Sequence, residues 1–425
     1  MHPEATNEIS RTRNTKRMLD ILDQSIRSTT ATQNDLLKNQ SASLEAISRL
    51  LNMPAYQAEQ ASLESFLFTR QQLEEFAVGS ITRCFGPDYR ILDERPTPRI
   101  PNGRLLLVDR VRGIAGRRME INPPASIISE VDVRPDAWFL KANPFDGVPL
   151  AILMEMALQP CGILSAYLGT SLVIPAQNHL FRNLDGWISQ TSNPNLAGKT
   201  IVNQAELTKS ITSGGLYIQS YRFQLSVQNQ VFLEGETSFG YFTQAVMNKQ
   251  SGLDLGEKRP MLMQAPDFPA GYTQIREKNQ EPVSLLDLTG ETWLNPGGGR
   301  HGMGAAIGKR RVDKEDWFFS NHFHGDPVMP GSLGVEAMMR GLANLAGNTV
   351  ENKKAPSIEL DLSKEEPLRW KYRGQVIPGN QNTYFETHIK EMKSKGGKTR
   401  VSADADFWVD GLRIYSVENL SILLR

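Results

Sequence analysis

The sequence predicts an α+β protein made of two tandem repeats, each built from one long apolar helix and antiparallel strands. The first observation is a repeated motif: the segment that starts at Trp138 aligns with the segment that starts at Trp317, and an apolar helical stretch follows each one. Glu155 lies in the first stretch and Glu336 in the second. The tryptophans are 179 residues apart and the glutamates 181, so one two-residue gap reconciles the copies. A repeat of this length indicates duplicated domains.

The second observation is the composition of the two helical stretches. The helices are predicted at residues 152–168 and 333–345. A helix that is apolar on most sides belongs in the centre of a fold, whereas a surface helix carries a polar face. The second helix is apolar on most sides, through Leu333, Val335, Ala337, Met338, Leu342 and Leu345.

The third observation is a set of strands after each helix. Residues 221–227 and 231–242 alternate between apolar and polar side chains, which is typical of half-buried strands. Near the C-terminus, Asp410-Gly411 separates residues 405–409 from 412–416, and Asp-Gly at such a junction favours a type I′ hairpin. A sheet wrapped around one apolar helix is the hotdog fold, so the chain is predicted to be a double hotdog.

Two elements are predicted before the first long helix. Thr69 and Gln72 form a Thr-x-x-Gln capping pattern, which predicts a helix that ends at residues 85–87, Phe-Gly-Pro. Residues 98–104 are rich in turn formers, and the apolar run at 105–111 that follows predicts a buried strand. The first repeat is predicted to begin at about this strand.

The composition of successive segments predicts four parts of the chain. Residues 1–67 are polar and are predicted to be a linker with a weak amphipathic helix. Residues 68–250 are predicted to form the N-terminal repeat, and residues 301–425 the C-terminal repeat. The segment 251–300, which contains Pro and a run of Gly, is predicted to be a connection with a mobile loop.

Composition limits the classes of function. The chain has 425 residues, 40% of them hydrophobic, which is enough for a sizeable core. Its 47 basic and 47 acidic residues cancel, so no overall field recruits nucleic acid. No membrane-spanning run and no signal peptide are predicted, and the expected location is the cytoplasm. Cys84 and Cys161 are expected to be reduced core thiols, because no cysteine or histidine accompanies them at metal-binding spacing.

Metal and nucleotide chemistry are not predicted. His301, His322 and His324 lack carboxylate or cysteine support at usable spacing for a metal. The glycines at 297–299 are not followed by the Lys-Ser/Thr pair of a phosphate-binding loop.

The segment His322–Met338, with its pattern His-Phe-x-Gly-Asp-Pro-Val-Met-Pro-Gly-x-Leu-Gly-x-Glu-Ala-Met, resembles the active-site segment of bacterial 3-hydroxyacyl-acyl-carrier-protein dehydratases of the 3-hydroxydecanoyl branch. Residues 370–378 are similar to a second stretch of that family. Residues 76–86 and 98–103 further resemble the dehydratase didomains of polyunsaturated fatty acid synthases and related lipid megasynthases. The resemblance covers residues 68–425.

Dehydration of a 3-hydroxyacyl thioester requires a base for the C2 proton, an acid for the C3 hydroxyl and donors for the thioester oxygen. His322 is the candidate base, because a neutral imidazole titrates near working pH. The backbone N–H groups of Gly331 and Ser332 are the candidate carbonyl anchor, because helix starts carry unpaired donors. The acid is expected to be a carboxyl group on a helix, kept protonated by apolar surroundings.

The resemblance implies which carboxyl group that is. In the family, two hotdogs pair through their helices, and each site takes its histidine from one and its acid from the other. The family has a glutamine four residues after the acid, and Gln159 follows Glu155 at this spacing, whereas Arg340 follows Glu336. The predicted site is therefore His322, Glu155 and Gln159, although the family usually has Asp at the acid position. The predicted vestigial second pocket combines Asn143, Glu336 and Arg340.

The resemblance implies conversion of 3-hydroxyacyl thioesters to trans-2-enoyl thioesters in fatty acid, polyunsaturated fatty acid or polyketide-type lipid synthesis. Two alternatives remain: a bifunctional dehydratase and isomerase with a cis-3-enoyl product, and a non-catalytic acyl-binding module. The domain is expected to bind no cofactor, because the phosphopantetheine of an acyl carrier protein carries the substrate. The expected partners are this carrier and other domains of a lipid megasynthase. The two hotdogs form an internal pseudo-dimer, so a further homodimer is optional.

Overall fold

A computed structural model describes residues 66–141, 143, 145–174, 178–213, 216–257, 270–275, 285–349 and 357–425. The linker and weak helix predicted for residues 1–67 lie outside these residues except for positions 66 and 67. Phe66–Arg425 form one compact unit.

The first half of this unit contains, in chain order, β1 (Phe68–Thr69), α3 (Arg70–Val78), α4 (Ile81–Phe85), the 3₁₀ turns η1 (Pro87–Leu92) and η2 (Gly103–Leu105), β2 (Arg110–Ala115), β3 (Ala125–Val133), α5 (Trp138–Lys141), α6 (Leu150–Tyr167), α7 (Thr170–Val173), β4 (His179–Gln190), β5 (Lys199–Ser213), β6 (Leu216–Val227), β7 (Gln230–Thr243) and α8 (Gln244–Met247). The second half contains β8 (Thr273–Ile275), β9 (Glu291–Asn295), β10 (Ala305–Arg311), α9 (Trp317–Asn321), α10 (Gly331–Thr349), β11 (Ile358–Leu360), β12 (Leu368–Tyr372), β13 (Asn382–Lys395), β14 (Lys398–Val409) and β15 (Leu412–Leu424).

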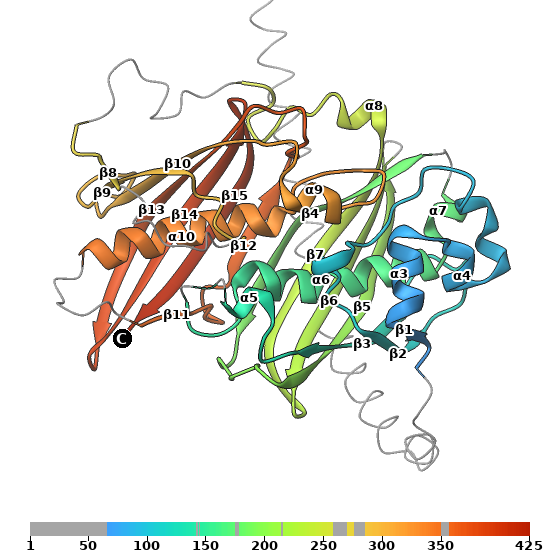
Figure 1. Cartoon of the computed structure of the whole chain (residues 1–425). Helices are drawn as coiled ribbons and strands as arrows, with labels where there is room; N and C mark the ends of the chain where they lie inside the picture. Colours follow the sequence, from blue (N-terminus) through green and yellow to red (C-terminus); the bar gives the residue numbers. More distant parts are fainter. Residues whose placement is uncertain are drawn as a thin grey trace, which may run out of the picture. The chain divides into compact units, whose positions relative to one another are not determined.

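The described strands form one antiparallel sheet that runs through both halves. Its order is β1-β2-β3-β5-β6-β7-β4-β12-β15-β14-β13-β10-β9-β8, with β11 paired to β15 at the side. Read outward from the β4–β12 junction, the two halves have the same order of strands, and each long helix connects matching strands. The duplication inferred from the sequence is thus present in the topology, and the fold is the predicted α+β double hotdog (Figure 1).

The junction between the halves depends on a glycine. Trp370 of β12 is registered opposite Gly186 of β4. A Cβ atom on Gly186 would lie 2.4 Å from the Trp370 ring, so a larger residue would push the two strands apart. The Trp370 indole N–H also donates to Oδ1 of Asn183 at 2.7 Å. One side chain therefore links the two hotdogs by packing and by a hydrogen bond.

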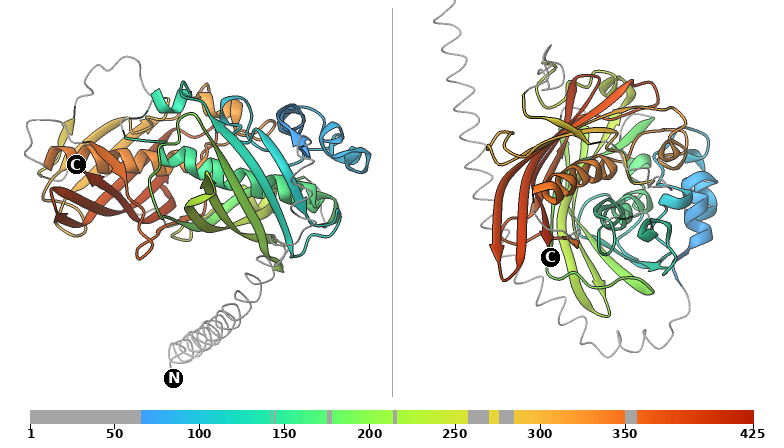
Figure 2. Two further views of the ribbon diagram at one scale, coloured as in Figure 1. Left: turned by 90° about the horizontal axis from the view of Figure 1, so that it is seen from below. Right: turned by 60° about the vertical axis from the view of Figure 1, so that its left-hand side comes forward.

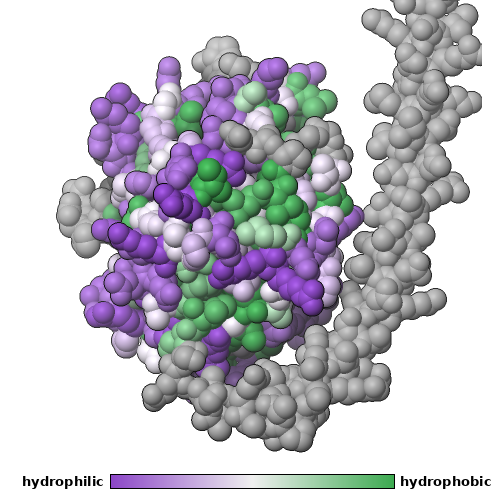
Figure 3. Space-filling model, turned by 90° about the vertical axis from the view of Figure 1, so that its right-hand side faces the viewer, coloured by the Kyte–Doolittle hydropathy of each residue, from purple (hydrophilic) through white to green (hydrophobic). Residues whose placement is uncertain are grey.

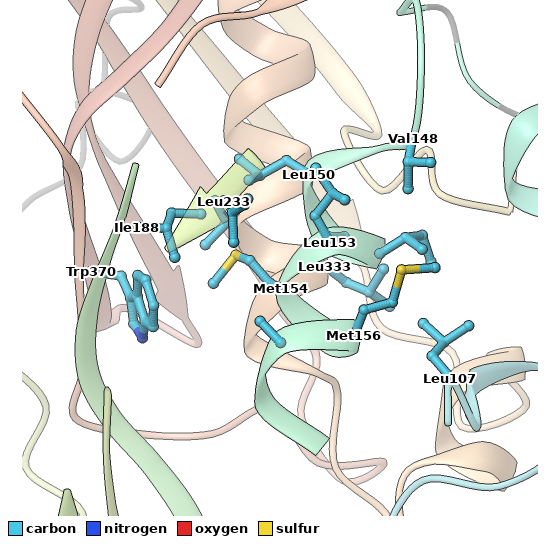
Figure 4. Close-up of a cluster of buried hydrophobic side chains, with 14 of the residues drawn as sticks. Leu107, Val148, Leu150, Leu153, Met154, Met156, Ile188, Leu233, Leu333 and Trp370 are labelled. Atoms are coloured by element: carbon cyan, nitrogen blue, oxygen red, sulfur yellow. The ribbon is translucent and has the colours of Figure 1, made fainter. Parts of the chain in front are cut away.

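The two long helices, α6 and α10, pack against one another and against the inner face of the sheet (Figure 2). Figure 4 shows the core between them, where Met154 of α6 and Leu333 of α10 lie among residues of both halves. By length and composition α6 could also cross a membrane, contrary to the sequence expectation, but 78% of it is buried inside the fold. It is therefore a core helix.

Two predicted elements are corrected. The helix predicted between Thr69 and Phe85 is two helices, because the chain breaks at Gly79-Ser80 and Ser80 caps α4; the capping box of Thr69 and Gln72 is confirmed. These helices lie at the end of the unit shown in Figure 3, where hydrophobic and hydrophilic surface residues are interspersed.

The strand predicted at 105–111 begins only at Arg110. The carbonyl of Leu105 and the amide of Leu107 bind the side chain of Gln159 instead of a neighbouring strand. The apolar run is therefore buried as predicted, but its backbone is satisfied by a helix side chain.

The other predicted strands are confirmed: residues 221–227 and 231–242 lie in β6 and β7. The Asp410-Gly411 hairpin joins β14 to β15, with φ of 49° and 86° at its two residues. Inside the segment 251–300, predicted as a connection, β8 and β9 complete the second half of the sheet. The second half therefore begins before residue 301, because β8 and β9 are the counterparts of β1 and β2 in the first half.

Candidate active site

A cavity of about 320 Å³ lies where the two halves meet. Its walls come from α6 and β4 of the first half and from the loop before α10, the start of α10 and β12 of the second half. The predicted residues His322, Glu155, Gln159, Gly331 and Ser332 all line it, together with Leu158, Gly162, Phe181, Arg182, Phe239, Tyr372 and Tyr415. The structure thus brings the histidine of one half and the acid of the other half into one cavity.

The loop after α9 sets the orientation of His322. The helix ends at Asn321, and the amide of His322, the next residue, donates to the carbonyl of Phe318 at 2.9 Å. The amide of Val328 closes the loop by donating to the His322 carbonyl at 2.7 Å. Nδ1 of the imidazole lies 2.8 Å from the carbonyl oxygen of Val328. Because a carbonyl can only accept, Nδ1 carries the proton and Nε2 keeps a free lone pair.

Burial lowers the pKa of His322 to about 4, and the nearby Arg182 guanidinium acts in the same direction. The imidazole is therefore neutral at neutral pH. A neutral ring with an unprotonated Nε2 is the state that a general base requires.

Glu155 lies in the middle of α6 and is 7% exposed. Its Oε1 accepts from the hydroxyl of Ser332 at 2.7 Å, and its Oε2 accepts from the amide of Gln159 at 3.0 Å. Both donors are neutral, and burial, the largest influence, raises the pKa of Glu155. The carboxyl group is therefore suited to stay protonated and to act as an acid.

Gln159 lies one turn after Glu155 and uses both ends of its amide. Besides the bond to Glu155, its nitrogen donates to the carbonyl of Leu105 at 2.7 Å, and its oxygen accepts from the amide of Leu107 at 2.8 Å. These three bonds fix the amide and, through it, the carboxyl group of Glu155. Gln159 is thus a positioning residue in this structure.

The start of α10 contains Gly331 and Ser332, the residues predicted to anchor the carbonyl. Gly331 and Ser332 are in the first turn, where N–H groups have no carbonyl partner within the helix. A Cβ atom on Gly331 would lie 2.6 Å from the ring of Tyr372, so only glycine allows this close approach. The amides are held at the wall of the cavity, next to Glu155, which binds the Ser332 hydroxyl.

Sequence reasoning missed Arg182, which ties the histidine loop to the other half. The Arg182 guanidinium donates two hydrogen bonds of 2.7 Å to the carboxylate of Asp326 and one of 2.8 Å to Gln375. Arg182 is on β4 of the first half, whereas Asp326 is in the loop after His322. The aspartate in the Gly-Asp-Pro motif was the only signal in the sequence, since a half-buried carboxylate needs a cation.

The residues of the predicted second pocket behave differently. Glu336 is 0% exposed, its Oε2 accepts from the amide of Ala151 at 3.2 Å, and its Oε1 lies 3.3 Å from Nε of Arg340. Burial raises the pKa of Glu336, but the Arg340 guanidinium opposes this shift. The side-chain nitrogen of Asn143 donates to the carbonyl of Gly147, and its side-chain oxygen accepts from the amide of Phe145. Asn143 therefore forms its side-chain hydrogen bonds within its own loop. Glu336 and Arg340 thus form a buried ion pair. Neither residue lines the cavity that contains Glu155.

No cluster of three or more His, Cys, Asp or Glu able to hold a metal occurs among the residues that the structure describes.

Comparison with known proteins defines the class. Residues 281–418 match the family described as the FabA-like domain, so the second half of the unit is a FabA-like hotdog dehydratase domain. Over 379 residues the chain is 33% identical to a subunit of the polyunsaturated fatty acid synthase from Thraustochytrium sp.. This match covers 82% of the chain and 25% of that protein, so the chain spans about a quarter of its relative.

The solved structures that match this chain share little of its sequence. An acyl-ACP thioesterase from Bacteroides thetaiotaomicron has a TM-score of 0.39 at 8% identity, with 70% of this chain and 97% of that chain covered. The dehydratase heterocomplex ApeI:P from Xenorhabdus doucetiae has a TM-score of 0.27 at 17% identity, with coverage of 34% and 90%.

Proposed function

We propose that the cavity at the junction of the two hotdogs dehydrates 3-hydroxyacyl thioesters to trans-2-enoyl thioesters. One observation carries the proposal: a neutral imidazole and a carboxyl group with a raised pKa, from opposite halves of the chain, line the same cavity. These are the base and the acid that elimination of water requires.

Each residue has one step in this reaction. Nε2 of His322 takes the C2 proton, while the amides of Gly331 and Ser332 stabilise the negative charge that develops on the thioester oxygen. The C2 electrons form the C2–C3 double bond, the C3–O bond breaks, and Glu155 donates its proton to the leaving hydroxyl, which departs as water. Transfer of a proton from the imidazolium to the carboxylate, through solvent, restores both groups.

The substrate carrier belongs to the proposal as well. The described cations at the cavity are Arg99, Arg182, Lys249 and Arg373, and Glu155 is the carboxyl group among its lining residues. Lys249 is exposed and lies near the mouth with α8, where it is suited to a phosphate group. We infer that the substrate arrives on the phosphopantetheine of an acyl carrier protein within a lipid synthase. Similarity to part of a polyunsaturated fatty acid synthase supports this inference.

The test compares the purified wild-type chain with His322→Ala, Glu155→Gln and Glu336→Gln. A 3-hydroxyacyl thioester of a carrier protein is the substrate, and formation of the enoyl product is followed. Glu336→Gln is the matched control, because it makes the same change at the equivalent position of the other repeat.

The proposal predicts loss of about 10²-fold or more in rate for His322→Ala and Glu155→Gln, with Glu336→Gln close to wild type. If Glu336→Gln is the inactive variant and Glu155→Gln is active, the assignment of the acid is wrong. If the wild-type chain binds the thioester without turning it over, the cavity is a binding module and the proposed reaction is wrong.

A further inference from the structure

The hydroxyl of Tyr372 has no function in the site described so far. Tyr372 is 6% exposed and lines the cavity, yet no hydrogen-bond partner for its hydroxyl exists among the described residues. Buried polar groups are nearly always paired, because an unpaired one loses its bonds to water without replacement. A buried, unpaired donor on a residue that lines a ligand cavity is suited to bind a ligand oxygen there.

The strand and its neighbours fix the position of this side chain. In β12 the inward residues are Leu368, Trp370 and Tyr372, which alternate with exposed ones. The Tyr372 ring packs against the ring of Tyr415, with centroids 4.5 Å apart, and against the backbone of Gly331. The ring is therefore held on both sides, next to the first residue of α10.

The electrostatic surroundings keep the hydroxyl protonated. Burial raises the pKa of Tyr372 well above 10, and the neighbouring Tyr415 and Glu155 raise it further. At any working pH the group is a hydrogen-bond donor. The influence of Glu155 on the pKa of Tyr372 also places the two side chains near one another.

We propose that the Tyr372 hydroxyl donates a hydrogen bond to the thioester carbonyl oxygen of the substrate, as a third donor beside the amides of Gly331 and Ser332. This inference rests on the proposed function. The substrate has two oxygens that could accept: the thioester carbonyl and the C3 hydroxyl. The contact between the Tyr372 ring and Gly331 places the donor at the carbonyl anchor, whereas the C3 hydroxyl is matched by the acid Glu155.

The consequence for catalysis follows from where charge develops. The thioester oxygen gains negative charge when C2 loses its proton, so a donor aimed at it stabilises the transition state more than the ground state. Loss of one such donor typically costs about 10²- to 10³-fold in kcat, and two amides would remain here, so we expect a loss of about 10- to 100-fold for Tyr372→Phe.

The test uses Tyr372→Phe, which keeps the packed ring and removes one oxygen, with Tyr217→Phe as the matched control. The Tyr217 hydroxyl donates to the carbonyl of Ile121 at 2.9 Å, and Tyr217 belongs to a small separate hydrophobic cluster and does not itself line the cavity. The two variants should give opposite results. Tyr372→Phe loses turnover and keeps or slightly raises its thermal unfolding temperature, whereas Tyr217→Phe unfolds at a lower temperature and keeps its turnover.

A binding measurement identifies the oxygen. A saturated acyl thioester has the carbonyl but no C3 hydroxyl, and we expect it to bind Tyr372→Phe several-fold more weakly than wild type. Equal affinity for both proteins would place the donor at the C3 hydroxyl or away from the substrate, and would overturn the inference.

Two further outcomes separate this inference from the proposed function. Wild-type turnover that is unchanged in Tyr372→Phe overturns the inference and leaves the dehydratase proposal intact. Absence of turnover in the wild type contradicts the dehydratase proposal, and the saturated thioester still reports on the hydroxyl. A marked loss of thermal stability in Tyr372→Phe would show a structural bond and would also overturn the inference.

Discussion

Glu155 and Glu336 occupy equivalent positions of the two central helices, but their neighbours give them different chemistry. Glu155 has Gln159 one turn later and the Ser332 hydroxyl across the helix pair, which are both neutral donors. Glu336 has Arg340 one turn later and the backbone amide of Ala151 across the pair. A duplicated fold therefore supplied two equivalent carboxyl groups, one bonded to neutral donors and the other placed beside a guanidinium.

The difference extends to the starts of the helices. Ser332 corresponds to Ala151 in the repeat, and both are in the first turn of their helix. The Ala151 amide donates to Glu336, whereas at Ser332 the hydroxyl binds Glu155 and leaves the amide to the cavity. The carboxylate of Glu336 thus binds the amide that corresponds, in the other repeat, to the proposed carbonyl anchor at Ser332.

The largest effect is expected from making the working half resemble the other one. Gln159→Arg places a guanidinium beside Glu155, which stabilises the carboxylate, lowers its pKa and removes the acid. We expect turnover to fall about 10²- to 10⁴-fold, as for loss of a general acid. Gln159→Met is the control, because it removes the amide without adding charge, and it should keep more activity. Turnover of Gln159→Arg at or above that of Gln159→Met would contradict this explanation.

The converse change tests the ion pair. Arg340→Met leaves Glu336 buried without its cation, which should lower the free energy of unfolding by about 3–5 kcal/mol. The double variant Glu336→Gln/Arg340→Met should recover most of that loss, because no buried charge remains. Urea unfolding of the three proteins measures both effects. An Arg340→Met protein as stable as wild type would show that the pair contributes nothing to the fold.

The dependence of kcat/KM on pH reports the pKa values of the proposed base, His322, and the proposed acid, Glu155. His322 acts as a base only when neutral, and its pKa is lowered to about 4, so the rate should fall as the pH drops through about 4. Glu155 acts as an acid only when protonated, and its pKa is raised, so the rate should fall as the pH rises through that raised value. A low-pH limb near the ordinary histidine value of about 6.5 would show that His322 is solvated.

The smallest effect is expected at the mouth of the cavity. Lys249→Glu should raise KM several-fold for a substrate on an acyl carrier protein, because an exposed charge contributes little and is screened by salt. For a short thioester without phosphate, the KM of Lys249→Glu should equal that of the wild type. Equal KM changes for both substrates would exclude a contact between Lys249 and the carrier or its phosphate.

Several parts of the site were readable from the sequence, and others were not. The assignments of His322 and Glu155 rested on the repeat and on a dense motif, and the two residues do meet in one cavity. Arg182 gave no comparable signal, because it lies in a strand and bonds to residues far away in the chain. Tyr372 lies in the stretch 370–378 that resembles the family, but nothing in the sequence marked its hydroxyl. The apolar run at 105–111 indicated burial correctly but not a strand, because its partner is the side chain of Gln159.

The sequence by itself determined the duplication, the two central helices, the C-terminal hairpin and the residue types available for chemistry. These features depend on local periodicity, turn residues and a repeated motif, all of which are written along the chain. Only the tertiary structure decided which carboxyl group lies among neutral donors and which lies beside a cation, where the hydroxyl of Tyr372 lies and how Arg182 holds the histidine loop. Such properties depend on burial and on neighbours from the other hotdog, and the distance between two residues along the chain does not reveal them.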